Sequence, residues 1–133
     1  MPFQYKPINK AILFRLILIV WFISIGTVSY LSIIPKLELP FGFKWDDKIH
    51  HFLAYLWLSA PPLIGFRRLK LGLTVAVLMI PFGIGLEIAQ HFIPGRFFSI
   101  FDMITNTIGV LLGIFLLKYL RTNTEQQIIN CKI

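Results

Sequence analysis

Residues 69–92 have the sequence LKLGLTVAVLMIPFGIGLEIAQHF, an apolar run that carries polar side chains near its end. A helical stretch of this length crosses the ~30 Å hydrocarbon core of a bilayer, because each residue advances the helix by about 1.5 Å. Glu87 lies inside the run, and a carboxylate at mid-bilayer costs roughly 2.5–3.5 kcal/mol, less near the interface. We therefore expect Glu87 to belong to a polar site within a membrane protein.

The composition of the whole chain supports a membrane protein. Of its 133 residues, 56% are hydrophobic and 14% are charged. A soluble domain of this length has too little interior to bury so much apolar surface. The net charge of +7 does not indicate a nucleic-acid partner, because the basic residues lie in short segments between apolar stretches. The single cysteine, Cys131, allows no intramolecular disulfide.

Four apolar stretches predict an all-α, polytopic membrane protein built as a four-transmembrane-helix bundle. They cover residues 11–34, 47–66, 69–92 and 101–120. The first is longer than the ~7–15 apolar residues of a signal peptide and has no clear cleavage site, so we expect it to be retained. The chain shows no internal repeat, and residues 1–133 are expected to form one domain. Pro61, Pro62 and Pro81 are expected to kink the second and third helices.

The basic residues predict the orientation of the spans. Nine of the 13 Lys and Arg residues fall at one set of helix ends: Lys6, Lys10, Arg15, Arg67, Arg68, Lys70, Lys118, Arg121 and Lys132. The others, Lys36, Lys44, Lys48 and Arg96, fall at the opposite ends. Since cytoplasmic segments carry the excess of Lys and Arg, both termini are expected in the cytoplasm and the first and third loops outside.

This topology brings polar residues on three helices to one level near the outer face. Glu87 and Asn106 each lie about 7 Å inside the end of their span, and His51 lies about 6 Å inside. Helical spacing places further polar residues on the same stripes. The stripes are Asp47, His51 and Tyr55, then Glu87, Gln90 and His91, then Asp102, Asn106, Gly109 and Gly113. The two glycines would let a neighbouring helix approach closely, and an oligomer through them is possible.

The polar residues occur in an order that resembles a known family. The segments are Asp47-Lys-x-x-His51, Glu87-x-x-Gln90, Pro94-x-Arg96 and Asp102-x-x-x-Asn106-x-x-Gly109-x-x-x-Gly113. This set resembles the VanZ-like family of small integral membrane proteins, named for a teicoplanin-resistance protein, over about residues 44–116. The resemblance implies an extracytoplasmic polar site and, for some members, lower susceptibility to glycopeptide antibiotics. It implies no particular reaction.

Glu87, His51 and Asp102 are the candidate catalytic residues. Glu87 could act as a general base, or it could be the buried anchor of an ion pair with Arg96 or Lys48. His51 could transfer protons or bind a metal together with Glu87, Asp102 and His91. Because no compact metal signature such as H-E-x-x-H is present, we expect no metal and no cofactor.

Several of these residues also have structural interpretations. Ser99-x-x-Asp102 before an apolar run is typical of a capping box, and Asp102 could also hold Arg96. Asp46 and Asp47 could be helix N-caps. His50 and His91 are expected at the interface, and Trp45, Phe97, Phe98 and Phe101 fit an aromatic belt there.

The candidate ligand-binding residues are Asp47, Lys48, Tyr55, Gln90, Arg96 and Asn106. Lys48 and Arg96 beside an embedded acid indicate an anionic ligand, such as the headgroup of a membrane lipid or a lipid-linked cell-wall precursor. We weigh three functions: an enzyme acting on such an envelope lipid, a non-enzymatic protein that binds the lipid or a glycopeptide, and a small transporter. Four spans without repeats are few for alternating access, so the transporter ranks last.

Overall fold

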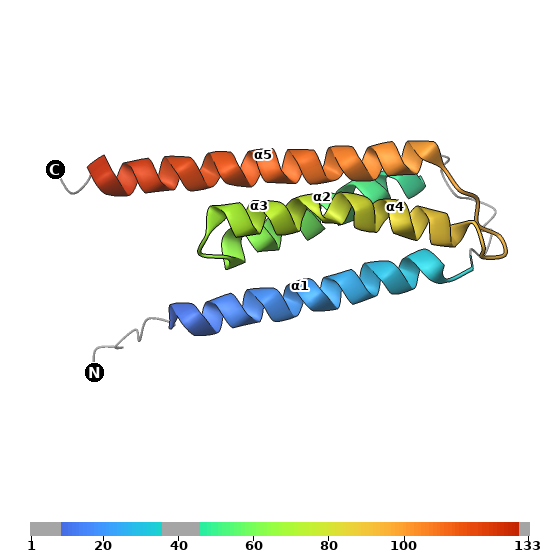
Figure 1. Cartoon of the computed structure of the whole chain (residues 1–133), viewed down its shortest axis with the longest axis horizontal. Helices are drawn as coiled ribbons and strands as arrows, with labels where there is room; N and C mark the ends of the chain where they lie inside the picture. Colours follow the sequence, from blue (N-terminus) through green and yellow to red (C-terminus); the bar gives the residue numbers. More distant parts are fainter. Residues whose placement is uncertain (1–8, 36–45, 131–133) are drawn as a thin grey trace.

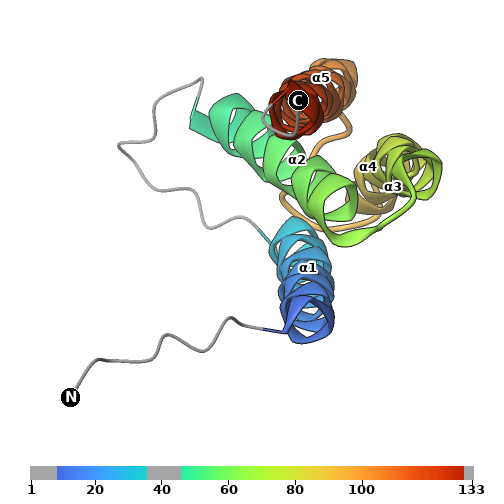
Figure 2. The same cartoon turned by 90° about the vertical axis from the view of Figure 1, so that its left-hand side faces the viewer.

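In the computed structural model, which describes residues 9–35 and 46–130, every regular element is a helix. The helices are α1 (Lys10–Ile33), α2 (Asp46–Gly65), α3 (Leu69–Val77), α4 (Met79–Gln90) and α5 (Ile100–Asn130). They run side by side along one direction, and α2 lies between α1, α5 and the α3–α4 pair (Figures 1 and 2). The prediction of an all-α protein is therefore confirmed.

Three helical stretches are long and apolar enough to cross a membrane. They are Ala11–Ile33, Leu69–Gln90 and Ile100–Asn123. Four spans were predicted, and α2 is the one outside this set, because acids, a lysine and two histidines occupy its first turns. One face of the centre of α2 is buried by the other helices, with Tyr55, Leu58 and Ser59 each 2% exposed or less, while Leu53 and Trp57 on its other side are exposed.

The outer surface of the bundle is apolar. On α1 the side chains of Phe22 and Ile23 are each 64% exposed, and on α5 Phe115 is 66% exposed. Water-soluble proteins rarely expose apolar patches of this extent. The arrangement is that of helices whose outer faces contact lipid, so the fold is that of a membrane protein.

Two helices, α3 and α4, replace the single helix predicted over residues 69–92. Pro81 has no N–H to donate to the carbonyl of Val77 four residues earlier, and α3 ends at Val77. Hydrogen bonding resumes at once, because the N–H of Phe82 donates to the carbonyl of Leu78 at 3.2 Å. The two helices therefore continue each other as one candidate span of 22 residues.

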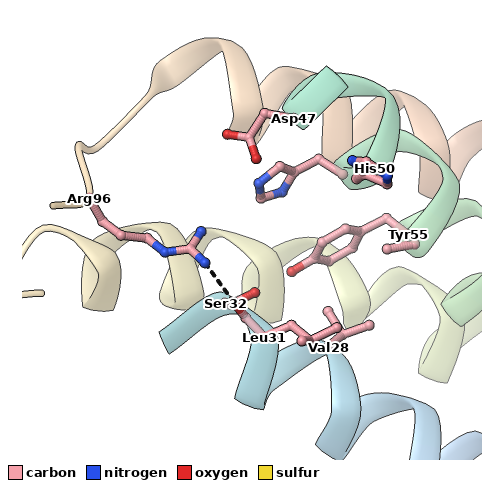
Figure 3. A pocket seen from close by; sticks show the side chains of 9 residues that line it. Val28, Leu31, Ser32, Asp47, His50, Tyr55 and Arg96 are labelled. Carbon is pink, nitrogen blue, oxygen red and sulfur yellow. Dashed lines mark hydrogen bonds between the residues drawn. The ribbon is translucent and has the colours of Figure 1, made fainter. Parts of the chain in front are cut away.

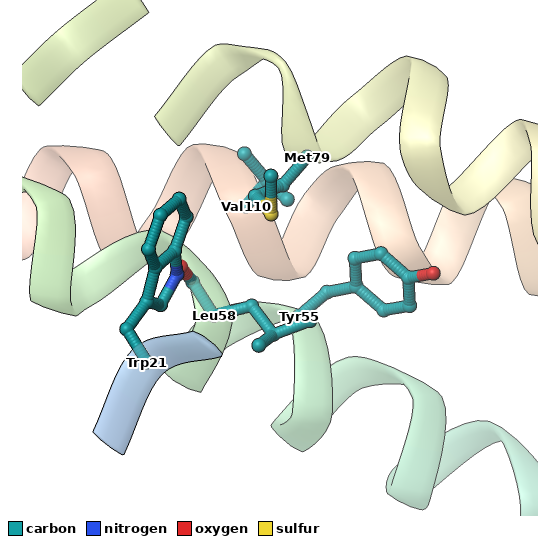
Figure 4. Close-up of a cluster of buried hydrophobic side chains, with 5 residues drawn as sticks. All are labelled: Trp21, Tyr55, Leu58, Met79 and Val110. Carbon is teal, nitrogen blue, oxygen red and sulfur yellow. The ribbon is translucent and has the colours of Figure 1, made fainter. Parts of the chain in front are cut away.

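The helix α2 continues through Pro61 and Pro62 to Gly65. Pro62 cannot donate to the carbonyl of Leu58, one turn earlier. The indole N–H of Trp21 in α1 donates to that carbonyl at 2.9 Å, so a neighbouring helix supplies the missing hydrogen bond. This contact lies within the buried apolar cluster of Trp21, Tyr55, Leu58, Met79 and Val110 (Figure 4).

Glycines in α5 bring it close to α2. A Cβ atom on Gly109 would lie 2.6 Å from the carbonyl oxygen of Phe52, and one on Gly113 would lie 2.9 Å from that of Leu56. Contacts this short are essentially never made by real side chains, so only glycine permits this helix separation. The predicted close approach is confirmed, and the partner helix is α2 of the same chain. An oligomer through these glycines stays a prediction.

The last helix is longer than predicted. It runs over 31 residues to Asn130 rather than ending at residue 120, a length of about 46 Å. Within it, Arg121 donates to the carbonyls of Leu63, in the last turn of α2, at 3.1 Å and of Arg67, just after α2, at 2.9 Å. A basic side chain therefore satisfies carbonyls that the end of α2 leaves without helical donors.

Candidate functional site

The polar residues gather at one end of the bundle, where α1 and α4 end and α2 and α5 begin (Figure 1). The turn between α4 and α5 crosses this end, and its Gly95 has a φ of 76°, a left-handed conformation that glycine adopts without strain. The prediction that three helices bring polar side chains to one level is confirmed by the distances below.

Glu87, His51 and Asn106 form the inner part of the site. The Nδ1 atom of His51 lies 3.1 Å from Oδ1 of Asn106 and 3.7 Å from Oε1 of Glu87. The side chain of Glu87 is 1% exposed, and neither of its oxygens accepts a hydrogen bond from the described residues. The backbone N–H of Ser99 also faces this carboxylate, without the geometry of a hydrogen bond.

This arrangement differs from the predicted ion pairs of Glu87. Neither Arg96 nor Lys48 bonds to it among the described contacts, and His51 is the described residue that places a group able to carry a positive charge near it, at 3.7 Å. A carboxylate held in this environment without donors is energetically costly. The site therefore contains a side chain that its immediate protein neighbours leave incompletely satisfied.

Lys48 and Asp102 form the outer part of the site. The Nζ atom of Lys48 lies 2.7 Å from Oδ1 of Asp102, a charge-assisted hydrogen bond between α2 and α5. The predicted pairing of Asp102 with Arg96 is therefore replaced by one with Lys48. The backbone N–H of Asp102 also donates to the Ser99 hydroxyl at 3.3 Å, so Ser99 caps α5 as its spacing predicted.

Asp47 lies next to both parts of the site. One ligand atom each from Asp47, His51 and Asp102 lie within 4.8 Å of one another. Because α2 begins at Asp46, Asp47 lies in the first turn of this helix, where a carboxylate interacts favourably with the helix dipole. Asp47 is thus both a helix-start residue and a member of the cluster.

Arg96 connects the site to α1. Its Nε atom donates to the carbonyl of Ile34 at 2.9 Å, and one terminal nitrogen donates to the carbonyl of Leu31 at 2.6 Å (Figure 3). These carbonyls lie at the end of α1, where a helix has no further internal donors. A guanidinium carries five N–H groups, and the contacts with residues 9–35 and 46–130 account for two of them.

Two pockets flank Arg96 and Asp47. The first has a volume of about 270 Å³ and opens between α1 and α2; its polar lining is Ser32, Asp47, His50, His51, Tyr55 and Arg96 (Figure 3). The second, of about 200 Å³, lies under the α4–α5 turn; its lining includes Asp47, Gln90, Arg96, Ser99 and Asp102. The two pockets share a carboxylate and a guanidinium, so a ligand there meets both signs of charge.

The remaining predicted residues take distinct places. Tyr55 is 2% exposed, and its ring packs so closely on Gly83 that a Cβ there would lie 2.8 Å away. Gln90 is 3% exposed, and its side-chain nitrogen has no hydrogen-bond partner among the described residues. His91 is exposed and stacks edge-on against Phe92, outside the cluster.

The predicted belt residues in the α4–α5 turn and the first turn of α5 are exposed, as an interfacial belt requires. Phe97 is 86% exposed and Phe101 is 70% exposed. Trp45, the other predicted belt residue, lies outside the described residues. The belt and the site therefore share one end of the bundle.

One polar residue of the larger pocket, Ser32, was not predicted from the sequence. Ser32, 9% exposed, lines the larger pocket together with Val28 and Leu31 of α1. The first helix has the sequence of a plain apolar span, which indicates no part in the site. The signal that could have identified Ser32 is its hydroxyl in the last turn of this apolar span, one turn after Val28.

Together these features define a class: an all-helical membrane protein with three candidate spans and a cluster of acids, amides, histidine and basic residues at one end. The chain belongs to the VanZ/LLP1 family, whose sequence model matches residues 10–121. It is similar to a protein of Schizosaccharomyces pombe named Uncharacterized protein C11E3.10, with 29% identity over 103 residues. That match covers 75% of this chain and 61% of the relative, so the chain spans less than two thirds of its length. No solved structure matches the chain.

Proposed function

We propose that this chain is a multi-pass protein of the cell membrane that binds the anionic headgroup of an envelope lipid or a lipid-linked cell-wall precursor. The observation that carries the proposal is Arg96, which lines both pockets and of whose five N–H donors two bond to carbonyls at the end of α1 among the described residues. A guanidinium is well suited to the oxygens of a phosphate. A site at a helix end, beside exposed aromatic residues, has the depth of a lipid headgroup.

The proposal includes the topology predicted from the basic residues. In it, α2 crosses the membrane as the fourth span, both termini are cytoplasmic and the site is extracytoplasmic. Two features support this. The helix α2 packs one face of its centre among the other helices, and Arg67, Arg68 and Arg121 lie at the end opposite the site. The excess of basic residues at that end matches a cytoplasmic face.

Binding of a cell-wall precursor would also account for a change in glycopeptide susceptibility. A protein that holds such a lipid alters how much of it an extracellular antibiotic can reach. We therefore propose that expression of the chain lowers susceptibility to teicoplanin, and that substitutions in the pocket abolish the effect.

A reaction on the bound lipid is the second candidate function. It is favoured by the inner part of the site, where Oε1 of Glu87 lies 3.7 Å from Nδ1 of His51. A carboxylate and an imidazole at this distance can pass a proton between them after a small movement. In that case Glu87→Gln would leave lipid binding intact and abolish turnover and phenotype, at unchanged abundance of the protein.

The binding proposal is tested with purified full chain in detergent, titrated with fluorescent phosphatidic acid. Arg96→Gln should weaken binding by about tenfold or more, because a hydrogen bond to a charged group contributes about 1.5–3 kcal/mol. Arg121→Gln is the matched control, since it removes an arginine that also bonds to carbonyls at a helix end, but at the opposite end of the bundle. Arg121→Gln should bind as the unchanged chain does.

The outcome that contradicts the proposal is equal affinity for the unchanged chain and Arg96→Gln. Equal competition by diacylglycerol, which has the same acyl chains without the phosphate, would also contradict it. Both variants must elute as single species of unchanged size, so that a loss of binding is not a loss of fold.

A further inference from the structure

We infer that Asp47, His51 and Asp102 form a divalent-cation site, with Glu87 beside it. The inference does not depend on lipid binding, because it rests on side chains that face one another within the chain. The sequence contains no compact metal signature, and these residues lie on two helices far apart along the chain. Only the packing of α2 against α5 brings them together.

The three side chains are close enough to share one ion. One ligand atom from each of them lies within 4.8 Å of the other two. An ion with bonds of about 2.0–2.2 Å holds its ligand atoms about 3–4 Å apart, so modest side-chain rotations would complete the site. Asp47 and His51 are one turn apart on the same face of α2, which is the spacing that helical metal-binding pairs use. Asp102 approaches from the first turn of α5.

The second observation is the unpartnered carboxylate of Glu87. It is 1% exposed, its oxygens accept no hydrogen bond from the described residues, and Oε1 points towards His51 at 3.7 Å. Buried carboxylates are found paired with cations or coordinating metals. A divalent ion bound by Nε2 of His51 and by the two aspartates would bring positive charge to the side of the imidazole ring opposite Glu87, where its field still acts on this carboxylate.

His51 is positioned as metal-binding histidines are. Its Nδ1 atom lies 3.1 Å from Oδ1 of Asn106, and an Nδ1–H that donates to this amide oxygen leaves the lone pair on Nε2. Histidine ligands commonly donate their second ring nitrogen in this way, which fixes the orientation of the ring. Asn106 is 3% exposed, so this contact is held within the packed interface of α2 and α5.

Charge also favours a cation. Asp47, Glu87 and Asp102 bring three carboxylates to the site, and Lys48 bonds to Asp102. The ammonium of Lys48 lies at one oxygen of Asp102, and its side chain is 30% exposed, so it can move aside. A divalent ion is attracted by the negative charge of these carboxylates. Carboxylate and imidazole together suit Mn²⁺ or Zn²⁺.

The test uses full chain purified in an uncharged detergent without phospholipid, freed of metals with a chelator and then desalted. Mn²⁺ is titrated in while the spectrum of the free ion is followed by electron paramagnetic resonance. The unchanged chain should bind one ion, and Zn²⁺ should displace it. His51→Gln and Asp47→Asn should each weaken binding at least tenfold. The control is His91→Gln, which removes an exposed histidine outside the cluster and should bind as the unchanged chain does.

The inference is overturned if the intact, monodisperse chain shows no saturable Mn²⁺ binding. Equal Mn²⁺ affinity of the unchanged chain and His51→Gln also overturns it. If His51→Gln fails to fold, equal Mn²⁺ affinity of the unchanged chain and Asp47→Asn overturns it instead. Because no phospholipid is present, failure of this experiment leaves the lipid-binding proposal standing. Conversely, a failure of phosphatidic acid to bind leaves the cation site standing.

Discussion

Replacing Gly109 with alanine tests the packing that assembles the site. A Cβ atom at this position would lie 2.6 Å from the carbonyl oxygen of Phe52 and 3.1 Å from the backbone nitrogen of Leu56. Both atoms belong to the backbone of α2 and cannot rotate away. The two helices must therefore separate by several tenths of an ångström, and the contacts between them must lengthen.

The expected magnitude is the difference of two terms. Overpacking a close interface costs about 1–3 kcal/mol, whereas alanine in a helix interior is favoured over glycine by about 1 kcal/mol. Gly85→Ala in α4 is the matched control, because a Cβ there meets nothing within 4 Å and only the favourable term applies. Gly109→Ala should therefore be less stable than Gly85→Ala by about 1–3 kcal/mol.

The measurement is thermal unfolding of both variants in the same detergent, followed by tryptophan fluorescence. The expected difference moves the unfolding midpoint by several degrees. A midpoint of Gly109→Ala at or above that of Gly85→Ala would refute the reasoning, since it would mean that α2 and α5 do not approach as closely as the contacts require.

Two further predictions concern hydrogen bonds that cross between helices. Trp21→Phe removes the donor to the carbonyl of Leu58. It should lower the free energy of unfolding by about 1–3 kcal/mol, because a buried carbonyl is left unsatisfied. Trp57→Phe loses a bond to a serine hydroxyl at the exposed surface, so it should lower the free energy of unfolding by less in the same assay. A double-mutant cycle with Lys48→Met and Asp102→Asn should give a coupling free energy of about 1.5–3 kcal/mol, and additivity to within about 0.5 kcal/mol would show that the ion pair contributes little.

The positions of the helices followed from the sequence with small errors. Apolar runs of membrane-spanning length predicted α1 and the α3–α4 span to within a few residues of their observed ends. Pro81 correctly predicted an interruption of this helix, but it did not predict that the run would form two separate helices, with α3 ending at Val77. The length of α5 was missed, because the polar residues after Leu120 no longer match an apolar pattern while still forming helix.

Within the site, depth along each helix was predictable and pairing was not. Counting residues from the helix ends placed His51, Glu87 and Asn106 at one level, and their side chains meet there. Arg96 was one possible partner of Asp102, beside a capping role, whereas the observed ion pair is with Lys48. Arg96 instead bonds to the end of α1, and no sequence pattern identifies a carbonyl as the partner of an arginine.

The sequence by itself determined that the chain is helical and belongs in a membrane, because hydrophobic length and proline chemistry act locally along the chain. It also determined which residue types reach the level of Glu87. Only the tertiary structure decided which of them touch: two glycines draw α5 onto α2, and this brings Asp102 and Asn106 against Lys48 and His51. Such contacts depend on the rotation and separation of whole helices, and those are set by packing over many residues rather than by any local pattern.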